Sequence, residues 1–405
     1  MAIHIFRNKN LVKIRFSYIF ILYLLIAVIA SIQCFHGFIR PPGLGGRVYS
    51  NYNNYILFKN SFFHLIQGKD LYKLYLNEEW DLYKYSPTFS LFFGLFAYLP
   101  DFIGLLFWNL LNAIPLLIGF SLIRGISDRD KIFALLFCFI ELMGNLQNSQ
   151  SNGLTAALLI LTFTSLENGK YILAAFFVVF SVYLKIYGGI GLVLFLFYPS
   201  KLRLLLYTLC WFILLGLLPL LVIDLNQLLY LYKSWGLLLK TDQVNSTGIS
   251  VMGLLQTVFK LNISKNFMEL SGIIVFLLPL FQIRKYKYYD FRLLVLASML
   301  IWVVIFNYKA ESPTYIIAIC GIAIWFFSQT KTSINLIILI LAFIFTTLSS
   351  GDLFPHYLRD GFIKNYYIKA LFSILIFGLI SYDLFKRKMT TEVAYLPKNL
   401  KEVNI

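Results

Sequence analysis

The chain has 405 residues, of which 59% are hydrophobic, 18% aromatic and only 13% charged. A soluble domain carries about 25% charged residues, so the composition excludes an ordinary water-soluble protein and indicates an integral membrane protein in a lipid bilayer. The net charge of +16 does not indicate a nucleic-acid partner, because the Lys and Arg residues lie in short clusters between apolar runs, as in cytoplasmic loops.

The apolar runs predict about twelve transmembrane helices, since a helix that crosses about 30 Å of hydrocarbon needs roughly 17 to 25 apolar residues. The first run follows a basic N-terminus, and no small-residue cleavage site follows it, so we expect a retained span rather than a signal peptide. The four runs between residues 131 and 199 are short, which favours positions inside the bundle. The predicted spans are 16–37, 101–123, 131–146, 153–167, 171–185, 187–199, 203–224, 267–283, 291–308, 313–329, 333–349 and 369–385.

These runs predict an all-α, polytopic, single integral membrane domain over residues 1–405. With a cytoplasmic N-terminus, every basic connection and the tail at 386–405 fall on one side, as the positive-inside rule requires. We therefore expect both termini in the cytoplasm and a multi-pass protein of a bacterial plasma (inner) membrane. The opposite, outer side then receives the segments 38–86, 147–152, 224–266, 307–313 and 350–368.

The first outer loop, 38–86, contains "YILFKNSFFHLI", whose apolar and polar positions suit a helix lying in the membrane interface. The following "YKYSPTFSLFFGLFAYLP" has about a dozen apolar residues between Pro87 and Pro100. That stretch is too short to cross the bilayer, so we expect it to dip in and return.

Several elements together resemble glycosyltransferase family 87, the DUF2029 group. They are the Y-x-Y-x-P entry of "YKYSPTFSLFFGLFAYLP", the "GKDLY" at 68–72, and the block "QNSQSNGL…SVYLKIYGG…YPSKLR", with a fainter match in "NYKAESPTY". The resemblance covers most of residues 45–205. It implies a GT-C-like membrane fold and a hexosyltransferase that moves a hexose, with mannose expected, from a polyprenyl-phosphate donor.

By the same resemblance, transfer takes place on the extracytoplasmic face of the cell envelope, with inversion, to a glycolipid or cell-surface glycan. No cofactor is firmly implied and no metal ligands are predicted, while a requirement for a divalent metal stays open. Such a reaction needs a base for the acceptor hydroxyl and cations or oriented donors for the leaving phosphate.

Lys185 matches the lysine of the family pattern, and a cation near apolar surroundings is costly enough to need a partner such as a lipid phosphate. The alternative is that its side chain snorkels to the interface. Amides without charge suit sugar hydroxyls, although they could equally cap helices. The expected substrate-binding residues are Lys185, Lys309, Gln147, Asn148, Gln150, Asn152, Tyr83 and Tyr85.

The catalytic base is the open question of the sequence. In the family pattern an Asp begins a D-x-x-x-Y element after the first span, but Asn51 holds that position here and asparagine accepts no proton at ordinary pH. Asp81, beside Trp80, is the leading replacement, and Glu311 is the second candidate. Glu141 lies inside an apolar run, and we expect it to pair with Lys185 rather than to act in catalysis.

Two other functions use the same residues. A carrier or flippase for lipid-linked sugars would bind and release them without bond formation, and a non-catalytic relative would keep only the glycolipid groove. A transferase needs an essential outer carboxylate, whereas carriers are often built from inverted repeats, and no such repeat is visible in the sequence.

Overall fold

The computed structural model describes residues 16–242, 247–350 and 354–389, and the predicted all-α class is confirmed. Within these residues the one sheet is a two-stranded antiparallel ribbon of β1 (Phe38–Ile39) and β2 (Tyr49–Ser50). The α-helices are α1 (Phe16–His36), α2 (Asn53–Ile66), α3 (Pro87–Ala97), α4 (Asp101–Leu122), α5 (Asp128–Gln147), α6 (Asn152–Glu167), α7 (Tyr171–Leu184), α8 (Lys201–Leu217), α9 (Leu225–Thr241), α10 (Val251–Val258), α11 (Lys265–Leu277), α12 (Tyr289–Ile305), α13 (Tyr315–Phe327), α14 (Ser333–Ala342), α15 (His356–Leu358) and α16 (Ile368–Lys386).

Each predicted span coincides with a helix, but twelve membrane crossings are not confirmed. In the described part of the chain, four helices are long and apolar enough to cross a bilayer, namely Phe16–His36, Asp101–Leu122, Lys201–Leu221 and Ile368–Lys386. α5 has 20 residues but carries four charged residues in its first turn and Glu141 in its interior, and the remaining helices are shorter. The predicted span at 187–199 is a 3-10 helix, Ile186–Phe197. Apolar runs thus located the helices, while helix length limits how many of them can cross alone.

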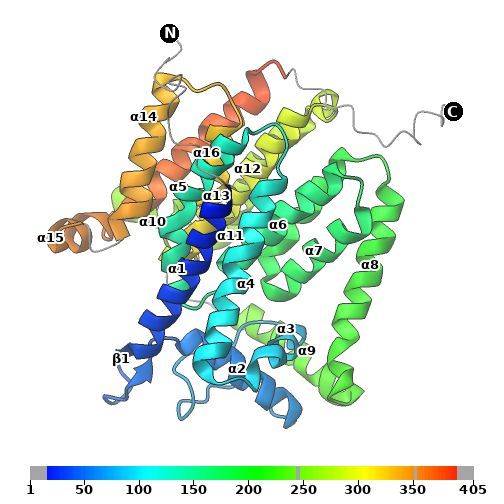
Figure 1. Ribbon diagram of the computed structural model, residues 1–405, viewed down its shortest axis with the longest axis vertical. Coiled ribbons are helices and arrows are strands. Elements are labelled where there is room, and N and C mark those ends of the chain that lie inside the picture. Colours follow the sequence, from blue (N-terminus) through cyan, green and yellow to red (C-terminus); the bar gives the residue numbers. More distant parts are fainter. Residues whose placement is uncertain (1–15, 243–246, 351–353, 390–405) are drawn as a thin grey trace.

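The centre of the molecule is α6, because every one of its residues is buried. It packs between α4 and α7, and α13 also contacts it (Figure 1). On one flank α1 packs against α4 and α5, and on another α12 packs against α13 and α16. The expectation that short apolar runs lie inside the bundle therefore holds for α6.

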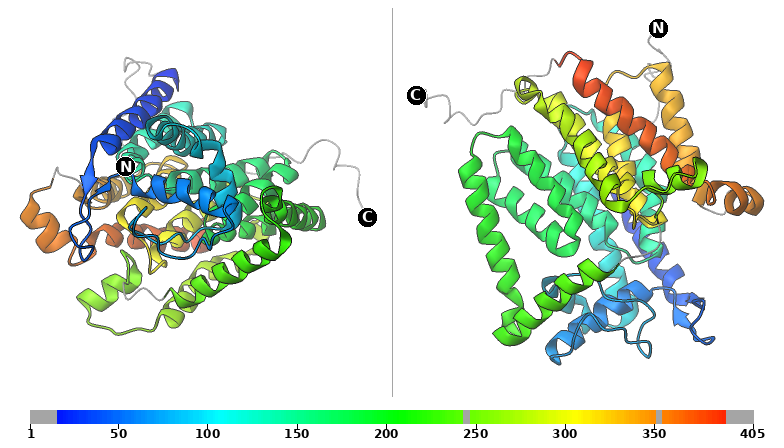
Figure 2. Two further views of the ribbon diagram at one scale, coloured as in Figure 1. Left: turned by 90° about the horizontal axis from the view of Figure 1, so that it is seen from below. Right: turned by 180° about the vertical axis from the view of Figure 1, so that it is seen from behind.

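The first loop and α9 lie together at one end of the bundle (Figure 1). α2 packs against α3, and Ser86 caps α3 by accepting a hydrogen bond from the Phe89 backbone amide at 3.1 Å. The helix predicted within the first loop is therefore present at Asn53–Ile66. α9 returns from the foot of α8 across this end (Figure 2), and neither α9 nor α10 was predicted within 224–266.

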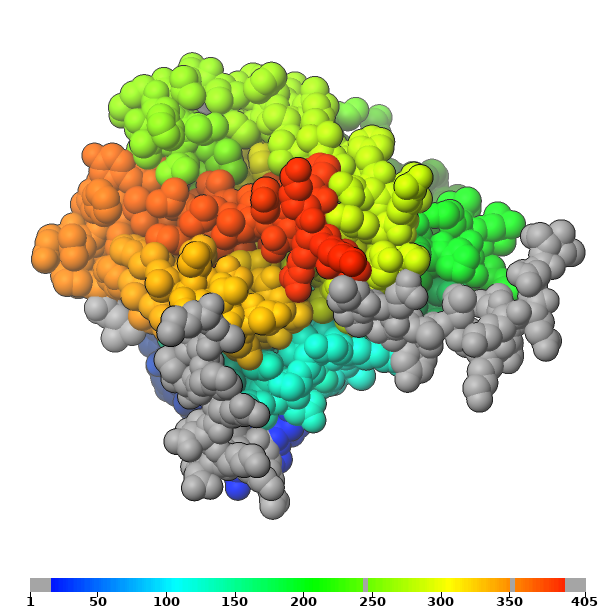
Figure 3. Space-filling view, turned by 90° about the horizontal axis from the view of Figure 1, so that it is seen from above, coloured from blue at the N-terminus to red at the C-terminus, as the bar shows by residue number. Residues whose placement is uncertain are grey.

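At the opposite end, α16 lies between α14 and the segment that precedes α12 (Figure 3). Lys285 holds this arrangement by donating to the Leu384 carbonyl at 2.8 Å. Nearby, Arg292 of α12 forms a buried ion pair with Glu167 at the end of α6, with Nε 2.6 Å from Oε1. The pair joins two central helices at this end.

Candidate active site

A hydrogen-bonded cluster lies where α6 begins and α7 ends. Lys185 follows the last residue of α7, where the backbone turns extended, and its Nζ donates to Asn152 Oδ1 at 2.6 Å. The Tyr187 hydroxyl donates a second hydrogen bond to Asn152 Oδ1, at 3.1 Å. Asn152 is buried as the first residue of α6, so the ammonium group is held against the rigid centre of the bundle.

The cluster continues to a carboxylate. The Asn152 Nδ2 donates to Gln150 Oε1 at 2.7 Å, and the Gln150 Nε2 donates to Glu311 Oε2 at 2.9 Å. Glu311 is exposed and stands directly before the short turn that opens α13. Two amides therefore connect a half-buried cation to a solvent-accessible acid, and four predicted site residues share one network.

Tyr85 faces this network. The Lys185 Nζ lies 5.8 Å from the centroid of the Tyr85 ring and 5.8 Å from that of Tyr187. Burial raises the pKa of Tyr85, and the charges of Glu311 and Asp81 raise it further. Both candidate acids therefore lie close enough to act on the same phenol.

Asp81 has weaker links to the cluster than Glu311. It is exposed, and its Oδ1 accepts a hydrogen bond only from the adjacent Leu82 amide, at 2.7 Å, within the described residues. Asn51 lies outside the cluster, because its backbone amide bonds to the Gly37 carbonyl at 2.8 Å and its side chain is exposed against Gly37. The three predicted catalytic residues are Asp81, Glu311 and Asn51. Of these, Glu311 is connected to Lys185 by hydrogen bonds through Gln150 and Asn152.

Other predicted binding residues point elsewhere. Gln147 donates to Gln33 Oε1 at 2.7 Å, and the Asn148 side chain donates to the Gly144 carbonyl at 2.8 Å. Tyr83 is buried and donates to the Ser86 carbonyl at 2.8 Å. These side chains tie helices and turns together, which was the alternative interpretation of the amides.

Lys309 forms a second charged group beside the cluster. Its Nζ lies 2.9 Å from Asp242 Oδ2, and Lys84 lies 3.4 Å from the same oxygen. Although burial favours the neutral acid, the hydrogen bond from Lys309 and the charge of Lys84 keep the pKa of Asp242 below its ordinary value. Asp242 was not predicted, because its loop offers no motif and its partners lie far away in the sequence.

Glu141 pairs with Lys369 and not with Lys185 as expected. The Lys369 Nζ lies 2.6 Å from Glu141 Oε1, both side chains are buried, and the ammonium group also donates to Ser312 Oγ at 2.9 Å. Ser312 follows Glu311 in the chain, so this pair holds the turn that carries the exposed acid. A buried acid alone signals a partner, but the sequence does not identify a lysine 228 residues away.

A glycine pair at 188–189, just after Lys185, can let a ligand's headgroup approach the backbone closely, because glycine has no side chain. A side chain at Gly188 would instead meet Ser181 Oγ at 2.0 Å, so the close approach of this turn to α7 accounts for that glycine. Gly189 has only an ordinary contact with Val182.

An apolar groove of about 780 Å³ runs beside the cluster between α3, α4, α6, α7 and α8. Thr88, Leu154 and Phe180 line one end, close in sequence to Tyr85, Asn152 and Lys185. Asn168 and Lys170 line the other end. Along α6 the lining extends from Leu154 to Ser165, roughly 17 Å at the helical rise, so the groove is long enough for several isoprene units.

Across residues 16–242, 247–350 and 354–389, no group of three or more His, Cys, Asp or Glu side chains could hold a metal ion. The Lys185 cluster consists of one cation, two amides, two phenols and an acid.

Comparison with known proteins places the chain in a family. The family model of glycosyltransferase family 87 matches residues 83–350, more than half of the chain and including the whole hydrogen-bonded cluster.

Two solved structures of ArnT from Cupriavidus metallidurans are similar to the chain. The apo state has 14% identity over 91% of this chain and 77% of that one, with a TM-score of 0.40. The state bound to undecaprenyl phosphate has 13% identity over 91% and 78%, with a TM-score of 0.36. No curated protein matches the chain significantly. The chain belongs to glycosyltransferase family 87, and is a membrane glycosyltransferase.

Proposed function

We propose that the protein transfers a hexose, with mannose the expected sugar, from a polyprenyl-phosphate donor to a glycolipid or cell-surface glycan. Transfer takes place on the outer face of a bacterial inner membrane, in a GT-C-type site. The observation that supports this most strongly is the hydrogen-bonded path from Lys185 through Asn152 and Gln150 to Glu311. This network contains a cation that can bind a phosphate and a carboxylate that can accept the proton of a hydroxyl.

The donor's lipid fits the apolar groove beside that path. Its lining is predominantly Leu and Phe, and it includes Leu154, two residues after Asn152, and Phe180, five residues before Lys185. A prenyl chain lying there would bring its phosphate to the ammonium group, where a charge-assisted contact in partly dry surroundings is strong. Lys185 then partners the phosphate, with Asn152 and Tyr187 orienting the ammonium group.

The reaction follows from these positions. The Glu311 carboxylate takes the proton of the acceptor hydroxyl while the hydroxyl oxygen forms a bond to the sugar's anomeric carbon. The bond between that carbon and the phosphate oxygen breaks, and its electron pair leaves with the polyprenyl phosphate. Attack opposite the leaving group inverts the anomeric centre. Lys185 stabilises the added negative charge on the phosphate, and the amides of Gln150 and Asn152 can bind sugar hydroxyls.

A carrier or flippase for lipid-linked sugars remains the second candidate, since the cation, amides and groove would serve it equally. The exposed Glu311 favours the transferase, because binding a lipid phosphate does not require a carboxylate within hydrogen-bonding reach of the sugar-binding amides. We also propose that residues 1–405 form one membrane domain, with the 38–86 loop outside and α2 at the interface. The proposed cytoplasmic tail at 386–405 lies mainly outside the described residues.

The purified protein in lipid nanodiscs, incubated with radiolabelled polyprenyl-phosphate mannose and a bacterial lipid extract, tests this proposal. Label should move to a new glycolipid or glycan in a reaction that requires Glu311. Donor binding without any transfer would leave the carrier, or a non-catalytic relative, as the function. Labelled donors that carry other hexoses identify the sugar.

A further inference from the structure

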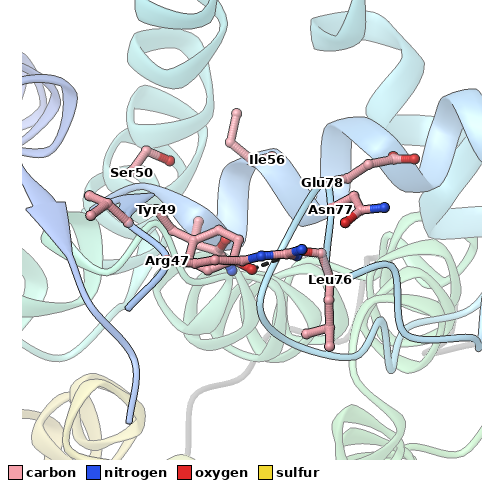
Figure 4. A pocket seen from close by; sticks show the side chains of 9 residues that line it. Arg47, Tyr49, Ser50, Ile56, Leu76, Asn77 and Glu78 are labelled. Atoms are coloured by element: carbon pink, nitrogen blue, oxygen red, sulfur yellow. Dashed lines mark hydrogen bonds between the residues drawn. The ribbon is translucent and has the colours of Figure 1, made fainter. Parts of the chain in front are cut away.

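A second cavity, separate from the Lys185 cluster, lies within the first loop at the same end of the bundle. It has a volume of about 530 Å³ and is shown in Figure 4. Three segments line this open pocket: residues 47–50 leading into and through β2, the first turns of α2, and the turn at 76–78. Its lining consists of Arg47, Val48, Tyr49, Ser50, Asn53, Ile56, Leu76, Asn77 and Glu78.

The walls are fixed by hydrogen bonds. Arg47 and Tyr49 both donate to the Leu76 carbonyl, Tyr49 at 2.7 Å, so the strand and the turn are tied together (Figure 4). Glu78 is held by the buried His64, with 2.9 Å between Oε2 and Nε2. A cavity with tethered walls is preformed, and a ligand that enters it orders little additional chain.

The cavity presents unused polar groups. Asn53 is 4% exposed, and its Oδ1 accepts a weak hydrogen bond from the Trp80 amide at 3.4 Å. Among the residues that the structure describes, no group accepts from the Asn53 Nδ2, and the side chains of Ser50 and Asn77 have no hydrogen-bond partner. Asn53 is nearly buried and lines the cavity, so its unused amide donor is available to a ligand that enters there.

The chemistry of the lining favours a neutral sugar. One guanidinium and one carboxylate balance each other, so the cavity offers no net charge to an isolated phosphate or carboxylate. Two amides, a serine hydroxyl and a carboxylate provide mixed donors and acceptors for neighbouring hydroxyl groups, and the Tyr49 ring provides an apolar face.

The cavity is connected to the candidate active site through two segments. The turn at 76–78 leads within a few residues to Asp81 and Tyr85. Asn54, next to Asn53, donates to the Asn148 carbonyl at 2.8 Å, two residues before Gln150. A saccharide that extends from Glu311 could therefore reach the cavity along the outer end of the bundle.

We propose that this cavity binds a neutral saccharide unit of the acceptor, one or more residues away from the hydroxyl that receives the sugar. That the saccharide belongs to the acceptor rests on the proposed function, whereas the binding itself does not. The site would select acceptors that already carry a glycan over simple lipids.

Saturation-transfer NMR on the full chain in nanodiscs tests the proposal, with neutral trisaccharides of mannose, galactose and glucose as probes. At least one should bind to the wild type. Asn77→Trp fills the cavity from an exposed position and should weaken that binding about tenfold or more, as should Asn53→Ala. Asn365→Trp, at another exposed asparagine, is the matched control and should change nothing.

Lys185→Ala should bind the trisaccharide as the wild type does, which separates this cavity from the donor site. Failure of every trisaccharide to bind, or equal binding by the wild type and Asn77→Trp, would overturn the proposal. Trisaccharide binding by a protein that transfers no hexose would overturn the proposed function and leave the saccharide site standing.

Discussion

The Lys185 Nζ donates a hydrogen bond to Asn152 Oδ1 at 2.6 Å. The bond joins the end of α7 to the start of α6 at the same end of the bundle. The contact fixes the cation on Asn152, two residues before Leu154 of the apolar groove lining, and within a network that reaches Glu311. A snorkelling lysine would point its amine toward bulk water. This one instead donates to a buried amide.

Replacing the cation tests its role toward the donor. Lys185→Ala should weaken binding of polyprenyl phosphate roughly 10- to 100-fold, the value of a charge-assisted contact. Lys201→Ala, at an exposed lysine that donates to the Leu196 carbonyl, is the control and should bind normally. Fluorescence anisotropy with a labelled short-chain polyprenyl phosphate measures both. Unchanged affinity in Lys185→Ala would remove this residue from the site.

Narrowing the groove tests the position of the lipid. Leu122, the last residue of α4, lines the groove away from its Leu154 end, and Leu122→Trp should weaken binding of a donor with many isoprene units about tenfold because the ring occupies the chain's space. A two-isoprene analogue of the donor should lose less affinity in the same variant. Ile213→Trp places the same ring on the exposed face of α8 and should leave both affinities unchanged. Equal losses for short and long chains would argue against the groove.

Breaking the buried Glu141–Lys369 ion pair should destabilise the fold. Removing one partner leaves an uncompensated buried charge, so Lys369→Met or Glu141→Gln should lower the free energy of unfolding by about 3–5 kcal/mol. The double variant should lose less than the sum of the two, because neither charge is then left alone. Denaturant unfolding in detergent measures this, and additive losses would show that the pair is not coupled.

Glu79 predicts a dependence of stability on pH. Burial raises its pKa to about 7, while the hydrogen bond from Asn60 opposes the shift and the charge of Glu78 adds to it. The folded state therefore holds this proton more tightly than the unfolded state. Stability should fall as pH rises from about 4.5 through about 7, because folding must then take up a proton or bury a charged carboxylate.

Glu79→Gln mimics the protonated side chain and should remove that loss. Its melting temperature should exceed that of the wild type at pH 8 and match it at pH 4.5. Asp81→Asn, two residues away and exposed, is the control and should follow the wild type at both values. A Glu79→Gln protein that loses stability with pH as steeply as the wild type would assign the effect to another group.

The sequence predicted the positions of the helices because long apolar runs and basic connections are local signals. It did not predict how many helices cross the bilayer, since α6 and α13 are short and buried by their neighbours rather than by lipid. The helices α9 and α10 were not predicted within 224–266, because the mixture of polar and apolar residues there indicated a loop.

The candidate site was predicted in part. Lys185, Asn152, Gln150 and Glu311 meet, yet Gln147 and Asn148, in the same short segment, bond to other elements. Which amides turn inward depends on the αL turn at Ser149 and on the start of α6, which no spacing rule specifies. Asp242, Lys369 and Tyr187 were missed because their roles depend on contacts between distant segments.

The most direct test of the account compares Glu311→Gln with Asp81→Asn for transfer of labelled hexose from polyprenyl phosphate, with donor binding measured in parallel. The substituted amide at position 311 would still offer an acceptor oxygen to Gln150 but could not take a proton. Glu311→Gln should therefore lose about 10²- to 10⁴-fold in transfer while binding donor normally, and Asp81→Asn should stay close to the wild type. Full activity in Glu311→Gln, or its loss in Asp81→Asn alone, would contradict the assignment of Glu311 as the base.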